Sequence, residues 1–235
     1  SKAHSFPANA VKWHPGHYYT VFNNEPEALT INEELKANQA LRGLQVRFAW
    51  SELETTEGLY NFSKIESKLA ELAGIKKHLI ILLQTKSFAQ NVKFVPDYLL
   101  TDTKYEGGIY RYGTSDGKIS YKGDNIKLWN SYVRDRLNAL VSELGKRVNS
   151  EVYFEGLGLS ETDLGLPQIP LTSAQKNGYF TNLINVAGTN AIYSYFPKMS
   201  GIIPIAPQIS YESYNNTSKD GSGHKPTLAE LLTYA

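Results

Sequence analysis

The sequence predicts an α/β fold built on a parallel β-sheet. Five apolar stretches with the composition of strands alternate along the chain with segments whose apolar residues recur at helical spacing. Strands that alternate with helices in this way favour a parallel sheet. The stretch His78–Gln84 is apolar almost throughout, which is typical of a strand buried on both faces.

The first half of the chain supplies two expected strands and two expected helices. Residues 17–22 are rich in aromatic and β-branched side chains and form the first expected strand, followed by a short helix at about 32–39. The second strand covers 43–50. Residues 63–73 have apolar side chains at helical spacing, and Gly74 stands where a helix C-cap would lie.

A long loop separates the third strand from the longest expected helix. Residues 88–124 are rich in Gly, Tyr and Asp, and loops of this length inside a domain are usually functional. We expect Asp124 to cap a helix over 126–148, whose apolar residues mark one buried face.

The fourth strand opens at Val152 and ends in the polar sequence Ser160-Glu161-Thr162-Asp163. Helical spacing resumes at Thr172 or Ser173 and continues to about residue 196. Residues 202–211 form the fifth expected strand, in which two prolines limit the hydrogen bonding. Another helix begins at about 227 and is still in progress where the sequence stops.

Composition excludes several classes of function. The formal net charge is +1, so no basic field argues for a nucleic-acid partner. No apolar run approaches the ~20 residues of a membrane span. Cysteine is absent, which excludes disulfides and thiolate chemistry. The start, Ser1 to Ser5, has the appearance of a chain from which a signal peptide has been removed, which leaves a secreted or periplasmic location open.

Two architectures fit the repeated βα pattern: a closed barrel and an open, doubly wound sheet. No Gly-rich phosphate-binding sequence follows the first strand, which argues against a nucleotide-binding fold. A (β/α)8 barrel typically needs about 250 residues. Five βα units already occupy the 235 residues here, so we expect either an open sheet or the front part of a barrel.

Residues 47–62 read Arg-Phe-Ala-Trp-Ser-Glu-Leu-Glu-Thr-Thr-Glu-Gly-Leu-Tyr-Asn-Phe. This segment resembles one found after the second strand of retaining TIM-barrel glycoside hydrolases, the β-galactosidase-like and cellulase-like families. Residues 95–99, Val-Pro-Asp-Tyr-Leu, resemble a Pro-Asp/Glu-aromatic-Leu segment of the same enzymes. The resemblance implies a (β/α)8 barrel of the TIM type, with residues 1–235 as a single domain of about five βα units, incomplete at its C-terminus.

The resemblance also implies catalytic roles. Glu161, at the end of the fourth strand, matches the general acid/base, and Arg47 matches the arginine that bonds the nucleophilic carboxylate. Ser160 stands where these families usually have an Asn that contacts the sugar 2-hydroxyl. Their nucleophile follows the seventh strand, so we expect it beyond residue 235.

Each of these residues also has a purely structural interpretation. Glu161 could cap the next element or bond a loop backbone, and Arg47 could pair with a carboxylate that holds the barrel together. We interpret Glu54 as a brace for the loop after the second strand. We interpret Glu155, which competes with Glu161 for the catalytic role, as a buried structural acid.

Six residues are candidates for contacts with a carbohydrate substrate. Trp50 can stack on a sugar or simply pack, and Gln84 and Lys86 can contact hydroxyls or only solvent. Ser160, His17 and Tyr211 complete the set: Ser160 and Tyr211 lie at the ends of expected strands, and His17 opens the first strand. His14 and His17 have no acidic partner at metal-ligand spacing, so we expect neither a metal nor another cofactor.

Two functions from different classes follow. The first is a retaining glycosidase that acts on a polysaccharide or oligosaccharide, and the second is a non-catalytic carbohydrate-binding or scaffold protein with a barrel-like fold. The replacement of Asn by Ser160 leaves the second open. A phosphate-dependent isomerase or aldolase is disfavoured because no Gly-rich anion loop is present and no strand ends in a Lys with a clear apolar setting.

Overall fold

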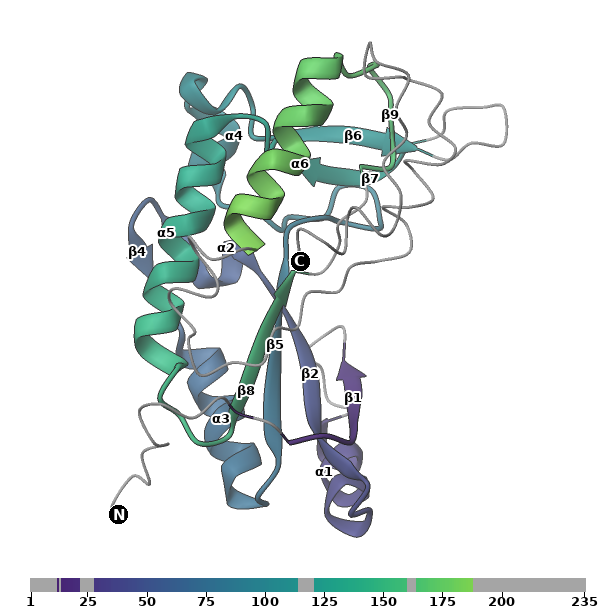
Figure 1. Ribbon diagram of the computed structural model, residues 1–235, viewed down its shortest axis with the longest axis vertical. Coiled ribbons are helices and arrows are strands. Elements are labelled where there is room, and N and C mark those ends of the chain that lie inside the picture. Colours follow the sequence, from purple (N-terminus) through teal and green to yellow (C-terminus); the bar gives the residue numbers. More distant parts are fainter. Residues whose placement is uncertain (1–11, 13, 22–27, 114–120, 160–163, 188–235) are drawn as a thin grey trace.

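The protein is built around a curved sheet of four parallel strands (Figure 1). Each strand pairs with the one that precedes it in this sheet, in the spatial order β1-β2-β5-β8. Such sequential parallel neighbours are the arrangement of a TIM barrel. The strands are β1 His17–Val21, β2 Leu41–Ala49, β5 His78–Gln84 and β8 Phe154–Leu159. The structure, a computed structural model, describes residues 12, 14–21, 28–113, 121–159 and 164–187.

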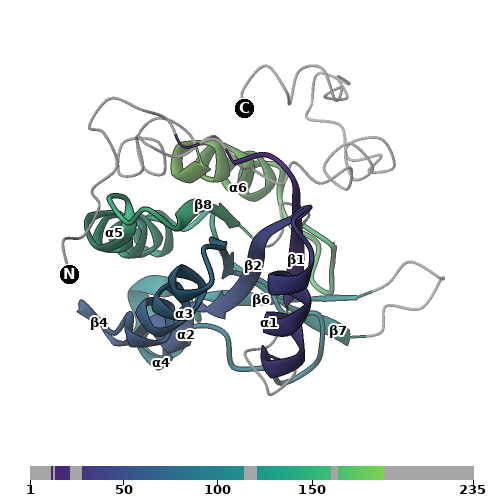
Figure 2. The ribbon, with the colours of Figure 1, turned by 90° about the horizontal axis from the view of Figure 1, so that it is seen from below.

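The helices that connect these strands lie on one side of the sheet. Seen from below, α1, α3 and α5 form an outer layer around the arc of strands (Figure 2), and α6 lies beside α5. The four helices are α1 Ala28–Ala37, α3 Ser63–Gly74, α5 Ser131–Val148 and α6 Ser173–Ala187. The four strands and these helices agree with the expected βα alternation. The expected fifth strand, 202–211, lies outside the described residues.

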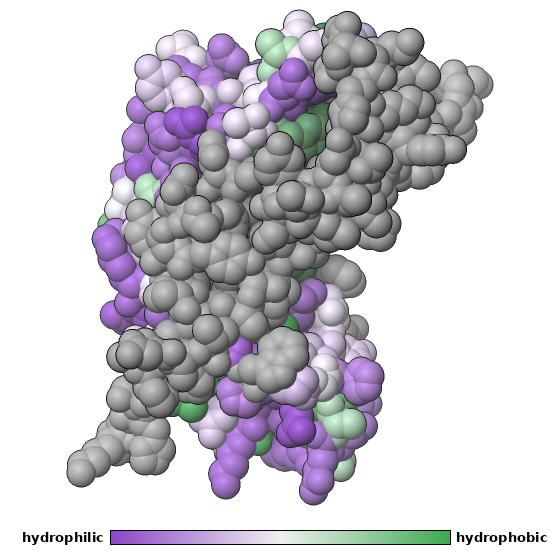
Figure 3. Space-filling model, in the orientation of Figure 1, coloured by the Kyte–Doolittle hydropathy of each residue, from purple (hydrophilic) through white to green (hydrophobic). Residues whose placement is uncertain are grey.

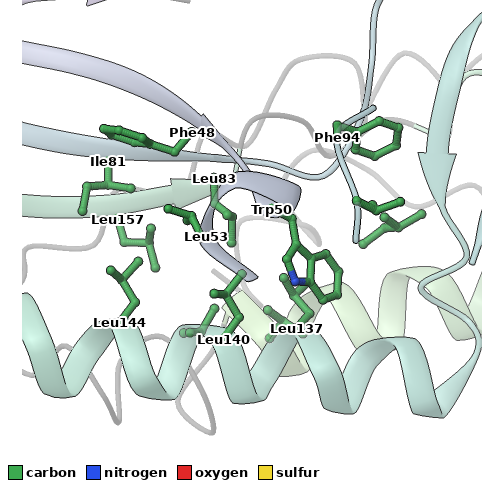
Figure 4. Packing of buried hydrophobic residues seen from close by; sticks show 14 of the residues in the cluster. Phe48, Trp50, Leu53, Ile81, Leu83, Phe94, Leu137, Leu140, Leu144 and Leu157 are labelled. Carbon is green, nitrogen blue, oxygen red and sulfur yellow. The ribbon is translucent and has the colours of Figure 1, made fainter. Parts of the chain in front are cut away.

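Alternate residues of each strand face the helices and form the core. Side chains from β2, β5 and β8 lie directly over the apolar face of α5 (Figure 4). Because side chains alternate along a strand, this packing fixes which residues face the opposite side of the sheet. The core includes Leu44, Val46 and Phe48 from β2, Leu79, Ile81 and Leu83 from β5, Leu157 from β8, and Leu137, Leu140 and Leu144 from α5.

The long segment after β5 is not the irregular loop that its composition predicts. It contains a short helix, a 3-10 turn and an antiparallel hairpin, and the hairpin forms a second, three-stranded sheet in the order β7-β6-β9. Its polar residues are hydrogen-bonded to distant parts of the chain, which local composition does not reveal. These elements are α4 Asp97–Thr101, η1 Thr103–Tyr105, β6 Ile109–Gly113, β7 Tyr121–Ile126 and β9 Leu166–Pro167.

Two expected helix caps are wrong. Asp124 lies inside β7, where its carboxylate accepts a hydrogen bond from the Tyr121 hydroxyl. The cap of α5 is Asn130, whose Oδ1 accepts hydrogen bonds from the backbone amides of Tyr132 and Val133 at 2.9 and 3.2 Å. Gly74 is the last residue of α3 rather than a left-handed cap.

The segment after β2 is braced by a buried glutamate, as the sequence predicts. It comprises α2 Trp50–Leu53 and the short hairpin β3 Glu54–Thr56 and β4 Leu59–Tyr60. Glu54 is fully buried and accepts hydrogen bonds from the Trp50 indole and the Gly58 amide, both at 2.8 Å. It also pairs with Arg136 of α5. This carboxylate therefore ties the loop after β2 to the helical layer.

Within the described residues, no helix is both long and apolar enough to cross a membrane. On the face shown in Figure 3, hydrophilic residues dominate the described surface and the apolar spots are small and separate. Single exposed apolar side chains of this kind are normal and do not define a docking surface.

We expect Glu54→Ala to lower the free energy of unfolding by about 3–5 kcal/mol, because it leaves the Arg136 guanidinium without its buried partner. Urea denaturation measures this loss. The matched control is Glu57→Ala in the same hairpin connection, which is exposed and should change stability by no more than about 0.5 kcal/mol. Equal losses in the two variants would contradict the bracing role of Glu54.

Candidate active site

The carboxyl ends of β2, β5 and β8 form one edge of the parallel sheet, where barrels place their chemistry. Arg47, near the end of β2, is in register with Leu82 of β5, which is in register with Gly158 of β8. These three residues form a row on the face of the sheet opposite the helices. Gly158 has no side chain and Leu82 is apolar, so Arg47 is the one charged residue of this row.

Arg47 is half-buried in this position. Burial lowers the pKa of the Arg47 guanidinium, but arginine remains protonated in proteins. The sheet therefore presents a fixed positive charge near the end of β2. The predicted location of Arg47 at the end of the second strand is correct, and its proposed contact with a nucleophilic carboxylate stays a prediction.

The chain that leaves β5 is covered by the small antiparallel sheet. Ser87 donates its backbone amide to the Asp124 carbonyl at 2.8 Å, and Lys86 forms an isolated antiparallel bridge with Asn125. Tyr112 of β6 donates its hydroxyl to the Ser87 carbonyl at 2.6 Å. The β7-β6-β9 sheet thus lies across the carboxyl end of β5, at the top of the view in Figure 1.

Gln84 and Lys86, expected to contact substrate hydroxyls or solvent, are instead buried under this sheet. The Gln84 amide donates to the Lys86 carbonyl at 3.1 Å. Lys86 is 2% exposed, and its Nζ lies 4.4 Å from the centre of the Tyr112 ring and 5.8 Å from that of Phe88. Cation–π contacts of this kind stabilise a desolvated ammonium. Both side chains therefore stabilise the packing of the small sheet against the end of β5 and do not line an open surface.

Asn125 joins the small sheet to α6. Its Nδ2 donates to the Tyr110 hydroxyl at 2.9 Å and to the Tyr179 hydroxyl at 3.1 Å, and its Oδ1 accepts from the Ile126 amide. Tyr110 in turn donates to the Leu164 carbonyl at 2.7 Å. The network fixes the backbone immediately after residues 160–163. Sequence reasoning missed it, because its members come from β6, β7 and α6.

Two sequence-predicted substrate residues do not occupy this edge. Trp50 is fully buried, and its indole donates to Glu54, so it packs in the core and cannot stack on a sugar. His17 is exposed, but it opens β1 and pairs with Leu41, the first residue of β2. It therefore lies at the amino edge of the sheet, opposite the carboxyl ends, and its assignment to the substrate site is wrong.

Three further candidates, Ser160, Glu161 and Tyr211, lie outside the described residues. The described chain stops at Leu159 of β8 and resumes at Leu164, whose carbonyl is held by Tyr110. The roles of Glu161, Ser160 and Tyr211 stay predictions.

A surface hollow of about 490 Å³ lies elsewhere, between the start of α3 and the last turns of α5. Its walls include Tyr60, Phe62, Glu66 and Arg147. The Arg147 side chain pairs with Glu66 across it. Because this hollow belongs to the outer helical layer, it is not part of the strand-end site.

Comparison with known proteins identifies the fold. No protein-family model matches the chain, and no curated protein matches it. Among solved structures, the catalytic domain of a β-amylase from Paenibacillus polymyxa is similar with a TM-score of 0.50 and 12% identity, covering 75% of this chain and 49% of that one. An endo-glycoceramidase II from Rhodococcus sp., in complex with a cellobiose-like imidazole, gives a TM-score of 0.49 at 11% identity, covering 73% and 42%. An α-galactosidase from Lactobacillus brevis gives 0.49 at 13%, covering 81% and 27%.

This likeness establishes the architecture. The chain has an α/β fold of the TIM-barrel type and resembles TIM-barrel glycoside hydrolases, as residues 47–62 predict. It spans about half the length of the β-amylase domain and a smaller share of the other two. At 11–13% identity the similarity concerns the fold alone.

We expect Asn125→Leu to destabilise the protein by about 2–4 kcal/mol, because it removes the buried hydrogen bonds of Asn125 to the Tyr110 and Tyr179 hydroxyls and to the Ile126 amide. Tyr179→Phe removes only one of these bonds and should cost about 1 kcal/mol. Thermal unfolding of both variants measures the difference. Similar losses would show that Asn125 is not the centre of the network.

Proposed function

We propose that the protein is a retaining glycoside hydrolase that acts on a polysaccharide or oligosaccharide, with Glu161 as general acid/base. The observation that carries the proposal is the register of Arg47 with Gly158 across β5. Glu161 follows Gly158 by three residues in the sequence, and the proposal assigns it to the same edge as Arg47. Two strand spacings, about 10 Å, separate β2 from β8, with Leu82 of β5 between Arg47 and Gly158.

Retaining hydrolysis needs two carboxyl groups about 5–5.5 Å apart, one as acid/base and one as nucleophile. The nucleophile has to be ionised, and a neighbouring guanidinium favours its charged form. Arg47 is suited to this task because it is half-buried and permanently cationic. In the proposed mechanism the nucleophile is a carboxylate that follows a later strand of the barrel.

A ring for stacking against a sugar is also available at this edge. Phe88 follows Lys86 after β5 and is 53% exposed. Sugars present apolar C–H faces that pack on exposed aromatic rings. Phe88 is therefore a better candidate for this contact than the buried Trp50.

We expect Glu161→Gln to reduce turnover of an oligosaccharide substrate by about 100-fold or more, because the leaving-group oxygen loses its proton donor. Substrates whose leaving group needs no proton should lose much less, and calorimetry should show that binding survives. Glu57→Gln, an exposed carboxylate of the β3–β4 connection, is the control and should retain full activity. Unchanged turnover in Glu161→Gln would refute the assignment.

Binding without any turnover in the wild type, over a broad panel of glycosides, would favour the alternative function, a non-catalytic carbohydrate-binding or scaffold protein. That outcome would leave the fold assignment intact, since the fold rests on the strand order and the structural comparison.

We expect Arg47→Gln to move the acidic limb of the kcat/KM profile to higher pH. Without the guanidinium, the pKa of the nucleophilic carboxyl rises, so a larger fraction is protonated and inactive at low pH. Arg42→Gln is the matched control, since Arg42 lies near the opposite end of β2 and donates to the Pro15 carbonyl. A profile that shifts equally in both variants would exclude a specific role for Arg47.

A further inference from the structure

A compact group of potential metal ligands lies at the amino edge of the sheet, away from the proposed active site. His14, His78 and Glu155 bring one ligand atom each within 4.8 Å of the others. Glu155 Oε2 lies 2.7 Å from His14 Nδ1 and 3.6 Å from His78 Nδ1. The residues come from the segment before β1, from the start of β5 and from β8, so their spacing in the sequence does not reveal the group.

A β-bulge brings the carboxylate to the two rings. Leu79 pairs with Phe154 and Ile80 pairs with Gly156, so Glu155 is an extra residue in β8. Bulges redirect side chains and are usually specific features rather than defects. Here Glu155 is 3% exposed, and its Oε1 accepts the His14 backbone amide at 2.9 Å. Its Oε2 is thereby directed toward the imidazoles.

His78 supplies a second, independent observation that points to a ligand at this group. It is 9% exposed, and its Nδ1 is buried with no hydrogen-bond partner. A buried polar atom left without a partner is costly and requires an explanation. At 3.6 Å from Glu155 Oε2, it is too far for a hydrogen bond but close enough for a shared cation.

We propose that His14, His78 and Glu155 bind a divalent transition-metal ion, most suitably Zn²⁺. Two imidazoles and one carboxylate are a three-ligand zinc set that leaves a fourth position for water. Tetrahedral bonds of about 2.0–2.2 Å place neighbouring ligand atoms about 3.3–3.6 Å apart. The 3.6 Å between His78 Nδ1 and Glu155 Oε2 agrees with this spacing, whereas His14 Nδ1, 2.7 Å from the same oxygen, has to move away from it. His14, whose side chain is 35% exposed, is the most exposed of the three residues.

Binding requires one local rearrangement. The two imidazole rings are stacked, with centres 3.9 Å apart and planes inclined by 21°. Lone pairs lie in the ring planes, so nearly parallel rings cannot both point at one ion. The partly exposed His14 ring has to turn about its χ2 torsion, whereas the buried His78 and Glu155 stay in place.

The positive charge of a neighbouring lysine limits the affinity of this group for a metal ion. Lys12 is fully buried and donates to the carbonyls of Asn149, Glu151 and Phe154, so its ammonium is fixed close to Glu155. With one carboxylate and a nearby cation, we expect a dissociation constant on the order of micromolar rather than the much tighter binding of thiolate sites. The ion would fasten residues 14–16 to β5 and β8, a structural role that fits the amino face of a barrel.

Titration calorimetry of chelator-treated protein with Zn²⁺ tests the site. We expect one ion per chain in the wild type, with affinity reduced about 100-fold or more in Glu155→Gln and in His78→Asn. The control is His17→Asn, which removes an exposed histidine close to His14 but outside the group and should bind like the wild type. Co²⁺ should give the visible absorption of a four-coordinate N/O site in the wild type and not in Glu155→Gln.

Glu155→Gln preserves the shape of the side chain and is therefore expected to fold. It tests the site by itself if His78→Asn fails to fold. Zn²⁺ should raise the Tm of the wild type and of His17→Asn but not that of Glu155→Gln. The proposal is overturned if the wild type binds no ion at about 100 μM Zn²⁺, or if His17→Asn weakens binding as much as Glu155→Gln does. Neither result depends on glycosidase activity.

Discussion

The burial of one face of the parallel sheet against α3 and α5 is the constraint on which the rest of the structure depends. Leu44, Val46 and Phe48 of β2 alternate with residues that face the other way. A shift of one residue would expose all three, and each fully buried apolar side chain contributes about 1.5–3 kcal/mol. The register is therefore strongly determined. Because it is, the opposite face of β2 has to present Gln45 and Arg47, and the position of the guanidinium follows from the packing of its neighbours.

Features that depend on contacts within a short stretch of the sequence were predicted well. The run His78–Gln84 is the strand β5 with the same bounds, since a continuous apolar run depends on local burial alone. Glu54 was recognised through its sequence context, and its bonds to Trp50 and Gly58 are local too. The cap of α5 was misassigned because Asp124 and Asn130 are equally good capping residues. Only the pairing of β7 with β6 excludes Asp124 from the helix.

Features that depend on distant parts of the chain could not be predicted from composition. Trp50 has the amphipathic ring of a sugar-binding residue, but α5 covers it and Glu54 occupies its indole nitrogen. Lys86 follows a strand end in the sequence, yet the β6–β7 hairpin folds back over it. In both cases the decisive contact is made by an element whose place is set by tertiary pairing. The same holds for His78 and Glu155, which a bulge in β8 brings together.

The two edges of the sheet hold charged groups in different surroundings, and our two proposals give these edges different roles. At the carboxyl edge, Arg47 is half-buried on the face of the sheet that it shares with Leu82 and Gly158. At the amino edge, the Lys12 ammonium is enclosed by three backbone carbonyls, and the Glu155 carboxylate is held by the backbone amide of His14. Groups restrained in this way fasten the chain and have little freedom to react. If the proposed reaction takes place at the carboxyl edge, the amino edge can keep rigid, fully bonded charges, and the proposed metal ion on His14, His78 and Glu155 would extend that restraint at the opposite end of the strands.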